Sequence, residues 1–117
     1  MGDWKEELRK IAVDVDATII RFSGKEERYI KYLKLFNEDT SFSELVDAIT
    51  EGNVSEAFEK CHMLKGLVNN FGFSEMIPAV NEACETLRAG SLDGVLPLLD
   101  SVTDNYNDII NVINSLL

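Results

Sequence analysis

Basic residues are scarce in this chain of 117 residues. Eleven Lys and Arg stand against 21 Asp and Glu, which gives a formal net charge of −10 at pH 7. Clustered positive charge is what binds nucleic acid and anionic membrane surfaces, so this balance opposes both as partners. We expect a protein partner or a metal-bearing one, and we interpret most of the acidic excess as solvated surface.

The chain also has few cysteines and lacks long apolar runs. The two cysteines, Cys61 and Cys84, lack the paired spacing of a zinc site or a redox motif, so we interpret both as core residues. No stretch approaches the roughly 18 apolar residues of a membrane span, and charged residues from Asp3 to Glu7 leave no apolar signal segment near the start. The sequence therefore predicts a cytoplasmic, monomeric protein that does not span a membrane.

Hydrophobic residues make up 45% of the chain and recur at helical spacing, without the alternation that strands show. This content favours one globular domain over residues 1–117. We expect helices at about residues 3–10, 14–22, 25–37, 41–52, 54–71, 74–89 and 92–117. Connections this short favour an all-α fold, namely an antiparallel up-and-down four-helix bundle with short N-terminal helices covering one end.

Residues with known capping preferences mark the expected helix ends. Gly24 and Gly72 suit the residue that follows a helix, where the backbone is often left-handed. Pro97 either lies early in the last helix, moves its start or kinks it, and the sequence leaves this open. The expected N-caps are Asp14, Ser41 in a capping-box pattern with Glu44, Asn53 or Ser55, and Ser74.

The helix expected over 54–71 separates a buried stripe from one at the edge of solvent. The residues predicted to be buried are Ala57, Cys61, Leu64, Val68 and Phe71, at steps of four and three. The neighbouring stripe consists of Phe58, His62, Lys65 and Asn69. His62 is the only histidine in the chain. Because free imidazole titrates below neutral pH, we expect much of His62 to be neutral and nucleophilic.

Gly66 breaks the local preference of this helix. Glycine inside a helix costs about 0.8 to 1 kcal/mol relative to Ala, so its position one turn after His62 needs a reason. Either the helix packs closely against a neighbour there, or the missing side chain lets a partner's backbone or a phosphoryl group approach His62. Lys65 places an ammonium beside His62, although a solvated surface lysine remains an alternative interpretation.

These residues resemble a known family. Residues 60–66 read KCHMLKG and residues 70–72 read NFG, and together they resemble the signature of histidine-containing phosphotransfer (HPt) domains. The segment from Val13 to Phe36 is similar to the lead-in of that family. The chain departs from the family pattern at Leu67, Val68 and Asn69, where small residues are common. These departures alter the expected docking surface and leave His62, Lys65 and Gly66 in place.

The resemblance implies a role in a two-component phosphorelay. His62 would accept a phosphoryl group from the aspartyl phosphate of a receiver domain, on a response regulator or a hybrid histidine kinase, and pass it to another receiver. Lys65 would support the phosphate oxygens, Gly66 would give clearance, and Phe58, Leu67 and Asn69 would contact the receiver, with Met63 as a further contact. The chain itself would need no cofactor or metal, since the Mg²⁺ would lie on the receiver.

Two other classes of function compete with this interpretation. The chain could be an interaction module that binds or inhibits a receiver without carrying phosphate, although such a protein would have no reason to keep His62. An enzyme that uses His62 as a general base or metal ligand is disfavoured. One histidine without a second histidine or a carboxylate at ligand spacing cannot hold a metal, and no nucleophile with an orienting acid accompanies it.

Overall fold

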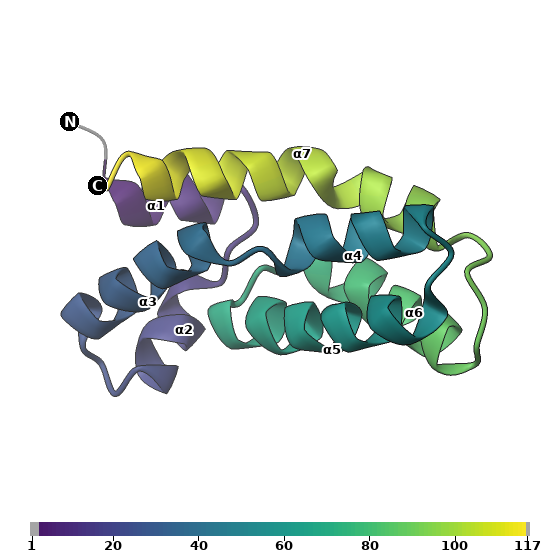
Figure 1. Cartoon of the computed structure of the whole chain (residues 1–117). Coiled ribbons are helices and arrows are strands. Elements are labelled where there is room, and N and C mark those ends of the chain that lie inside the picture. The colour runs from purple at the N-terminus through teal and green to yellow at the C-terminus, as the bar shows by residue number, and fades with distance from the viewer. Residues whose placement is uncertain (1–2, 117) are drawn as a thin grey trace.

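The computed structural model describes residues 3–116 and is all-helical (Figure 1). The helices are α1 (Trp4–Lys10), α2 (Val15–Arg21), α3 (Glu26–Glu38), α4 (Ser41–Thr50), α5 (Val54–Phe71), α6 (Met76–Arg88) and α7 (Val95–Asn114). Within the described residues, β pairing is confined to one isolated antiparallel bridge between Val13 and Phe73. The predicted all-α class is confirmed.

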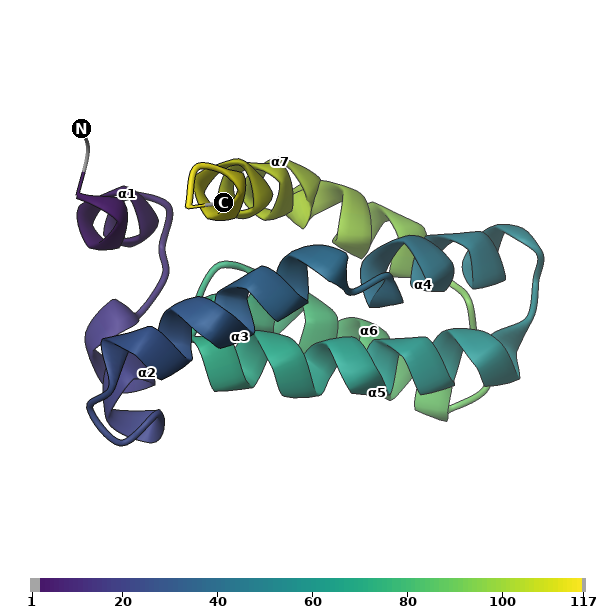
Figure 2. The ribbon, with the colours of Figure 1, turned by 60° about the vertical axis from the view of Figure 1, so that its left-hand side comes forward.

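The long helix α5 packs between α4 and α6. Helix α7 lies along α6 and also contacts α4, α3 and α1, as both ribbon views show (Figures 1 and 2). Helices α3 and α4 follow one another beside α7, while α2 packs against the C-terminal half of the molecule's central helix α5. The arrangement leaves one long side of α5 and α6 uncovered by other helices.

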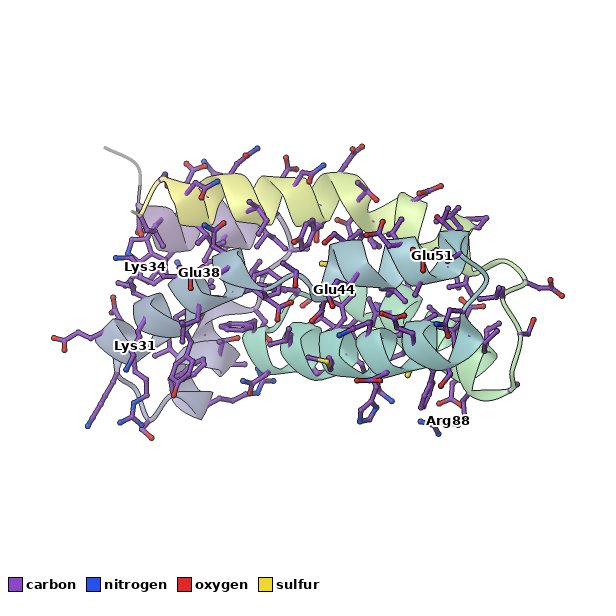
Figure 3. The ribbon with its side chains drawn as sticks, viewed as in Figure 1. Lys31, Lys34, Glu38, Glu44, Glu51 and Arg88 are labelled. Carbon is purple, nitrogen blue, oxygen red and sulfur yellow. The ribbon has the colours of Figure 1, made fainter. Side chains whose placement is uncertain are left out.

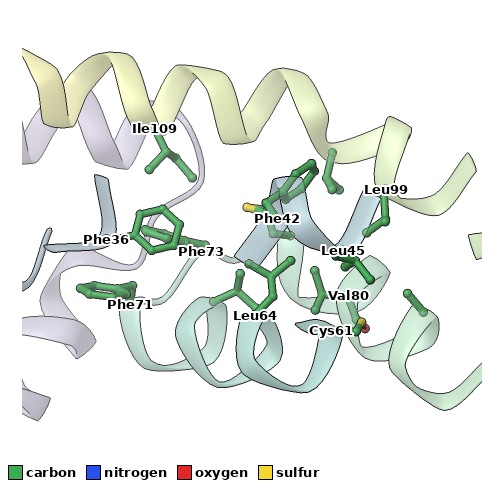
Figure 4. Packing of buried hydrophobic residues seen from close by; sticks show 14 of the residues in the cluster. Phe36, Phe42, Leu45, Cys61, Leu64, Phe71, Phe73, Val80, Leu99 and Ile109 are labelled. Atoms are coloured by element: carbon green, nitrogen blue, oxygen red, sulfur yellow. Dashed lines mark hydrogen bonds between the residues drawn. The ribbon is translucent and has the colours of Figure 1, made fainter. Parts of the chain in front are cut away.

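A cluster of aromatic rings fixes the C-terminal end of α5. The rings of Phe71 and Phe73 stack with centroids 5.5 Å apart, and Phe36 from α3 lies 5.6 Å from Phe71 and 5.1 Å from Phe73 (Figure 4). All three side chains are almost fully buried. Burying a large apolar side chain contributes about 1.5 to 3 kcal/mol, so the Phe36 ring of α3 helps to fix the C-terminal end of α5.

Backbone hydrogen bonds join the start of α2 to the turn after α5. The Asp14 N–H donates to the Gly72 carbonyl oxygen at 2.7 Å, and the Ser74 N–H donates to the Ala12 carbonyl oxygen at 2.9 Å. The Arg21 guanidinium donates to the Asn70 carbonyl oxygen at 3.1 Å. These contacts use carbonyl groups that a helix end leaves unpaired, and they fix the turn between α5 and α6.

Several predicted helix ends are confirmed. The Asp14 carboxylate accepts from the Ala17 N–H at 3.2 Å and caps α2. Of the two alternatives for α5, Asn53 is the N-cap, because its side-chain oxygen accepts from the Glu56 N–H at 3.0 Å. Gly72 ends α5 with φ +70°, in the left-handed region that glycine adopts without strain.

Two predicted caps are wrong. Ser41 is the first residue of α4 and is buried, and the residue before it, Thr40, makes the side-chain contact with Glu44. Ser74 does not cap α6 either, since α6 begins at Met76 and the Ser74 hydroxyl donates back to the Gly72 carbonyl oxygen. In both cases the serine lies one residue from the cap position, which is occupied by Thr40 in α4 and by Glu75 in α6.

The last helix begins later than predicted. It starts at Val95, not near residue 92, because Gly94 adopts φ +74° immediately before it. Pro97 is therefore the third helical residue, where its missing N–H would have no partner inside the helix. Of the alternatives that the sequence left open, Pro97 thus lies early in the last helix. Residue 117, at the predicted end of this helix, lies outside the described residues, as do residues 1 and 2 at the start of the predicted domain.

Candidate functional site

His62 lies on the solvent side of α5, as its place beside the apolar stripe predicted. The side chain is exposed, whereas the stripe residues are buried without exception: Ala57, Cys61, Leu64, Val68 and Phe71. A helix turns by about 100° per residue, so Phe58, Lys65, Gly66 and Asn69 share the surface around His62. We call these five residues, 58, 62, 65, 66 and 69, the His62 face.

Three side chains are stacked along one edge of the His62 face. The rings of Phe58 and His62 have centroids 6.1 Å apart and planes inclined by 28°. The guanidinium carbon of Arg88, at the end of α6, lies 5.7 Å from the Phe58 ring centroid. Figure 3 shows Arg88 beside α5 at the lower edge of the molecule. The Phe58 ring thus contacts both the imidazole and a cation from a different helix, α6.

Arg88 is a residue that the sequence reasoning missed. It forms an exposed ion pair with Glu85, one turn earlier, at 3.4 Å, and a pair of this kind holds its side chain only weakly. In the packing of α5 on α6 the Cys61 and Cys84 thiols lie next to each other, and one further turn along the pair residue 88 lies next to residue 58. No pattern within α5 alone indicates this contact.

The two lysines of the motif have different surroundings. Lys60 forms an ion pair with Glu44 on α4 at 2.8 Å, and this pairing raises the pKa of Lys60 and lowers the pKa of Glu44. Lys65, by contrast, makes no ion pair within 4.0 Å among residues 3–116 and is half-buried. The ammonium of Lys65 is therefore available to an anionic group beside His62.

Gly66 lies on the surface of α5 at a position that no other side chain covers. A Cβ atom built on it would meet no atom within 4 Å outside its own helix backbone, so α5 has no close neighbour at this point. Of the two explanations that the sequence left open, close packing against another helix is excluded among residues 3–116. The missing side chain instead lowers the helix surface one turn from His62.

The remaining predicted contact residues are placed unequally. Asn69 is exposed on the His62 face, and its side-chain amide donates to the Lys65 carbonyl oxygen at 2.8 Å. Leu67 is half-buried and packs against the core, about 140° around the helix from His62. Met63 is exposed, about 100° from His62. The structure therefore places Asn69 on the His62 face, two turns from His62 along the helix, and places Leu67 and Met63 on other sides of α5.

The neighbouring thiols belong to the core, as predicted. Cys61 and Cys84 are fully buried free cysteines, and the Cys61 thiol donates to the Val80 carbonyl oxygen at 3.6 Å. Burial, together with the nearby Cys84 thiol, raises the pKa of Cys61 to about 12. Because the reactive form of cysteine is the thiolate, Cys61 is poorly suited to act as a nucleophile on this part of α5.

In the described part of the chain, no three His, Cys, Asp or Glu side chains are grouped so that they could hold a metal ion. Over the same residues, none of the helices has both the length and the apolar character needed to cross a membrane. Comparison of the chain with protein-family models, with curated proteins and with solved structures found no match. Function is therefore inferred from the motif and from the geometry of the His62 face.

Proposed function

We propose that this protein is a histidine phosphocarrier of a two-component phosphorelay, an HPt domain in which His62 is the phosphoryl acceptor. The observation that carries the proposal is the bare surface at Gly66 beside an exposed imidazole. That glycine costs helix stability and fills no packing role within residues 3–116. Clearance for another protein to approach His62 accounts for it.

The arrangement of the helices supports an HPt-like four-helix bundle. Contacts of α4 with α5, α5 with α6, α6 with α7 and α7 with α4 close a ring of four helices. The connections between successive members are short, which favours antiparallel neighbours. In this interpretation α1, α2 and α3 cover the end of the bundle near the C-terminus of α5, and the His62 face is the long side of α5 beside α6.

The proposed reaction needs little from the carrier except position. A lone pair on a ring nitrogen of neutral His62 attacks phosphorus, a P–N bond forms, and the P–O bond to the receiver's aspartate breaks. The electron pair leaves with the aspartate as a carboxylate, and the other ring nitrogen keeps its proton. Mg²⁺ bound to the receiver would neutralise phosphoryl oxygens, so in-line placement is the main requirement on this chain.

Two cations of this chain would assist that transfer. Lys65, which has no acidic partner within the described residues, would contact phosphoryl oxygens as a point charge. Arg88 is held beside Phe58 at the edge of the same face and would meet the acidic rim of a receiver's phosphorylation site. The phosphoryl donors and acceptors proposed are receiver domains of response regulators and of hybrid histidine kinases.

The test uses a receiver domain phosphorylated in the presence of Mg²⁺ and mixed with the purified chain. We expect a phosphoryl group on the chain that is labile to acid and stable to alkali, as a phosphohistidine is. His62→Gln should abolish labelling and leave the melting temperature nearly unchanged, because the ring is exposed. The matched control is Asp108→Asn, an exposed residue on α7, which does not pack against α5, and it should label as the wild type does.

Other outcomes would decide against the carrier. Equal labelling of His62→Gln would remove His62 as the acceptor. Failure of several receivers to label the wild type, combined with tight binding of one of them, would favour the alternative in which the chain is an interaction module that binds or inhibits a receiver domain without being phosphorylated.

A further inference from the structure

The segment that contains α3 carries positive charge on an otherwise acidic protein. Between residues 21 and 34 the chain has five basic and two acidic residues, which gives a local net charge of +3, against −10 for the whole chain. The four basic residues from Lys25 to Lys34 lie on or next to α3. Figure 3 shows Lys31 and Lys34 on this helix, at the end of the molecule remote from Arg88.

Five exposed side chains form one stripe along this helix. They follow steps of three and four residues, so they share one side of α3 about 120° wide. The stripe contains no acidic residue. Its members, which we call the α3 stripe, are Lys25, Arg28, Lys31, Tyr32 and Leu35.

The cations of the stripe are free of acidic partners. Among residues 3–116, none of Lys25, Arg28 and Lys31 has a carboxylate oxygen within 4.0 Å. Glu26 is engaged by Lys5 of α1 at 3.1 Å, whereas Glu27 and Glu38 line the hollows beside the stripe without pairing with its cations. The cations of the stripe are therefore not engaged in ion pairs within the described residues, and an approaching anionic group could pair with them directly.

The two apolar members of the stripe are exposed, and the Tyr32 ring is held in place by stacking. The Tyr32 ring stacks on Phe22 with centroids 5.2 Å apart and planes inclined by 22°, and Phe22 in turn stacks on the buried Tyr29. Tyr32 remains 42% exposed and Leu35 48% exposed. A rigid aromatic ring and a leucine beside arginine and lysine have the composition of a protein-binding surface, where little side-chain freedom remains to be lost on binding.

We propose that the α3 stripe is a docking site for an acidic amphipathic helix of a partner protein, separate from the His62 face. A helix with apolar residues at steps of three and four would pack on Tyr32 and Leu35, and its flanking carboxylates would pair with Arg28 and Lys31. The hollows on either side of Lys31, lined in part by Gly24 and Ile30, give the apolar side chains room.

The negative charge on the rest of the molecule favours a partner whose contact surface is no wider than the α3 stripe. The protein measures 43 × 25 × 21 Å, and electrostatic screening extends over about 8 to 10 Å at physiological salt. A flat bilayer or a nucleic-acid duplex would lie within that range of acidic surface next to the stripe and would be repelled by it. A single helix, about 10 to 12 Å wide, contacts the stripe alone.

The test measures binding of a synthetic probe by fluorescence anisotropy. The probe is an Ala-rich helical peptide with two leucines and a row of glutamates on one face, and its control is the same peptide with Gln in place of each Glu. We expect the Glu peptide to bind the full chain and the Gln peptide to bind at least about fivefold more weakly at about 0.15 M salt.

Variants of α3 locate the binding. Arg28→Glu combined with Lys31→Glu should weaken the Glu peptide by about tenfold or more, and Leu35→Ser should weaken both peptides. The matched control is Arg9→Glu combined with Lys10→Glu, which makes the same charge change at two exposed positions of α1 outside the stripe and should alter binding by less than about twofold. Labelling of His62 should be the same in all of these variants, so the outcome is independent of the proposed phosphotransfer.

Three results would overturn the proposal. One is equal binding of the Glu and Gln peptides, or no loss in the doubly reversed variant. Another is binding to vesicles that contain phosphatidylglycerol in preference to the peptide, which would assign the stripe to a membrane. The third is a dimer in light scattering that the double reversal dissociates, which would make a second copy of this chain the occupant.

Discussion

Gly72 and Thr18 lie so close together that a Cβ atom on Gly72 would be 2.7 Å from the Thr18 hydroxyl oxygen. The same Cβ would be 2.9 Å from the Asp14 carbonyl oxygen, a backbone atom that cannot rotate away. The Thr18 hydroxyl is itself within hydrogen-bonding distance of the Phe71 carbonyl oxygen, at 2.9 Å. This contact attaches the end of the helix that carries His62 to α2.

We predict that Gly72→Ala lowers the free energy of unfolding by more than the left-handed backbone alone explains. Alanine at φ +70° costs about 1 to 2 kcal/mol, and the clash with α2 adds to that cost. Gly90→Ala is the control, because Gly90 has φ +85° and open space around a new Cβ. Urea unfolding followed by circular dichroism measures both. Equal losses in the two variants would show that the contact with α2 yields without cost.

Substitution of Gly66 should have the opposite effect on stability. Gly66→Ala removes a poor helix former from exposed surface and should raise the free energy of unfolding by about 0.8 to 1 kcal/mol. The bulkier Gly66→Leu should slow phosphoryl transfer from a receiver without unfolding the chain, because it fills the clearance beside His62. The measurements are urea unfolding and the rate of labelling. A wild-type rate in Gly66→Leu would remove the clearance role.

Local patterns predicted the parts of this structure that depend on one helix at a time. The steps of three and four along residues 57–71 identified the buried stripe and hence the exposure of His62. The preference of Asp14 and Asn53 for N-cap positions, and of Gly72 for a left-handed residue, depends only on neighbouring backbone groups. Such features are encoded within a few residues, so they can be inferred without knowing the fold.

Features that depend on two segments could not be inferred in this way. Ser41 has the chemistry of a cap but is buried at the start of α4, where packing takes precedence over capping preference. The approach of Arg88 to Phe58 depends on how α5 meets α6, and the partial burial of Leu67 depends on how α5 packs against the core. Whether Gly66 faced another helix or solvent was equally undecidable, because glycine suits both. Each of these required the positions of neighbouring helices.

Arg88 should matter for transfer and not for stability. Its ion pair with Glu85 is exposed, and such pairs contribute about 0 to 1 kcal/mol, so Arg88→Gln should unfold within about 0.5 kcal/mol of the wild type. The same variant should slow labelling of His62 several-fold, since it removes a cation from the edge of the docking surface. Arg9→Gln, on α1, is the control for a lost surface charge. Unchanged labelling in Arg88→Gln would confine Arg88 to its contact with Phe58.

Alkaline pH should destabilise the fold through the ionisation of its buried thiol and phenol groups. Burial is the main cause that raises the pKa of the Cys61 thiol to about 12, and burial also raises the pKa values of Tyr29 and Tyr106. The folded state thus favours the protonated groups. Their contribution is complete below the unfolded-chain pKa values, about 8.5 for Cys and 10 for Tyr, and is lost as pH rises toward the folded values.

Urea midpoints should therefore fall progressively above about pH 9. Cys61→Ala isolates one of the groups: its stability is lower at every pH because a buried side chain is truncated, but the fall between about pH 9 and 12 should be shallower than in the wild type. Identical slopes in the two proteins would mean that the Cys61 thiol ionises in the folded state as readily as in the unfolded chain.

Asn105 should prove to be a structural residue of α7 despite its polarity. It is 6% exposed, and its side-chain amide donates to the Ile11 carbonyl oxygen at 2.7 Å, at the end of α1. Asn105→Ala leaves that carbonyl without its donor and should cost about 1 to 3 kcal/mol, whereas Asn107→Ala, at an exposed position of the same helix, should change stability by less than about 0.5 kcal/mol.

The loss should be concentrated at α1, because the hydrogen bond of Asn105 joins α7 to its C-terminal end. Hydrogen exchange would then show faster exchange of the α1 amides in Asn105→Ala than in the wild type, with the amides of α5 less affected. Asn105→Asp should lower stability further, since a carboxylate cannot donate to the Ile11 carbonyl oxygen and would be a buried charge. Its stability should improve as pH falls and the carboxyl is protonated. A variant as stable as the wild type at neutral pH would show that α1 is held to α7 by apolar packing alone.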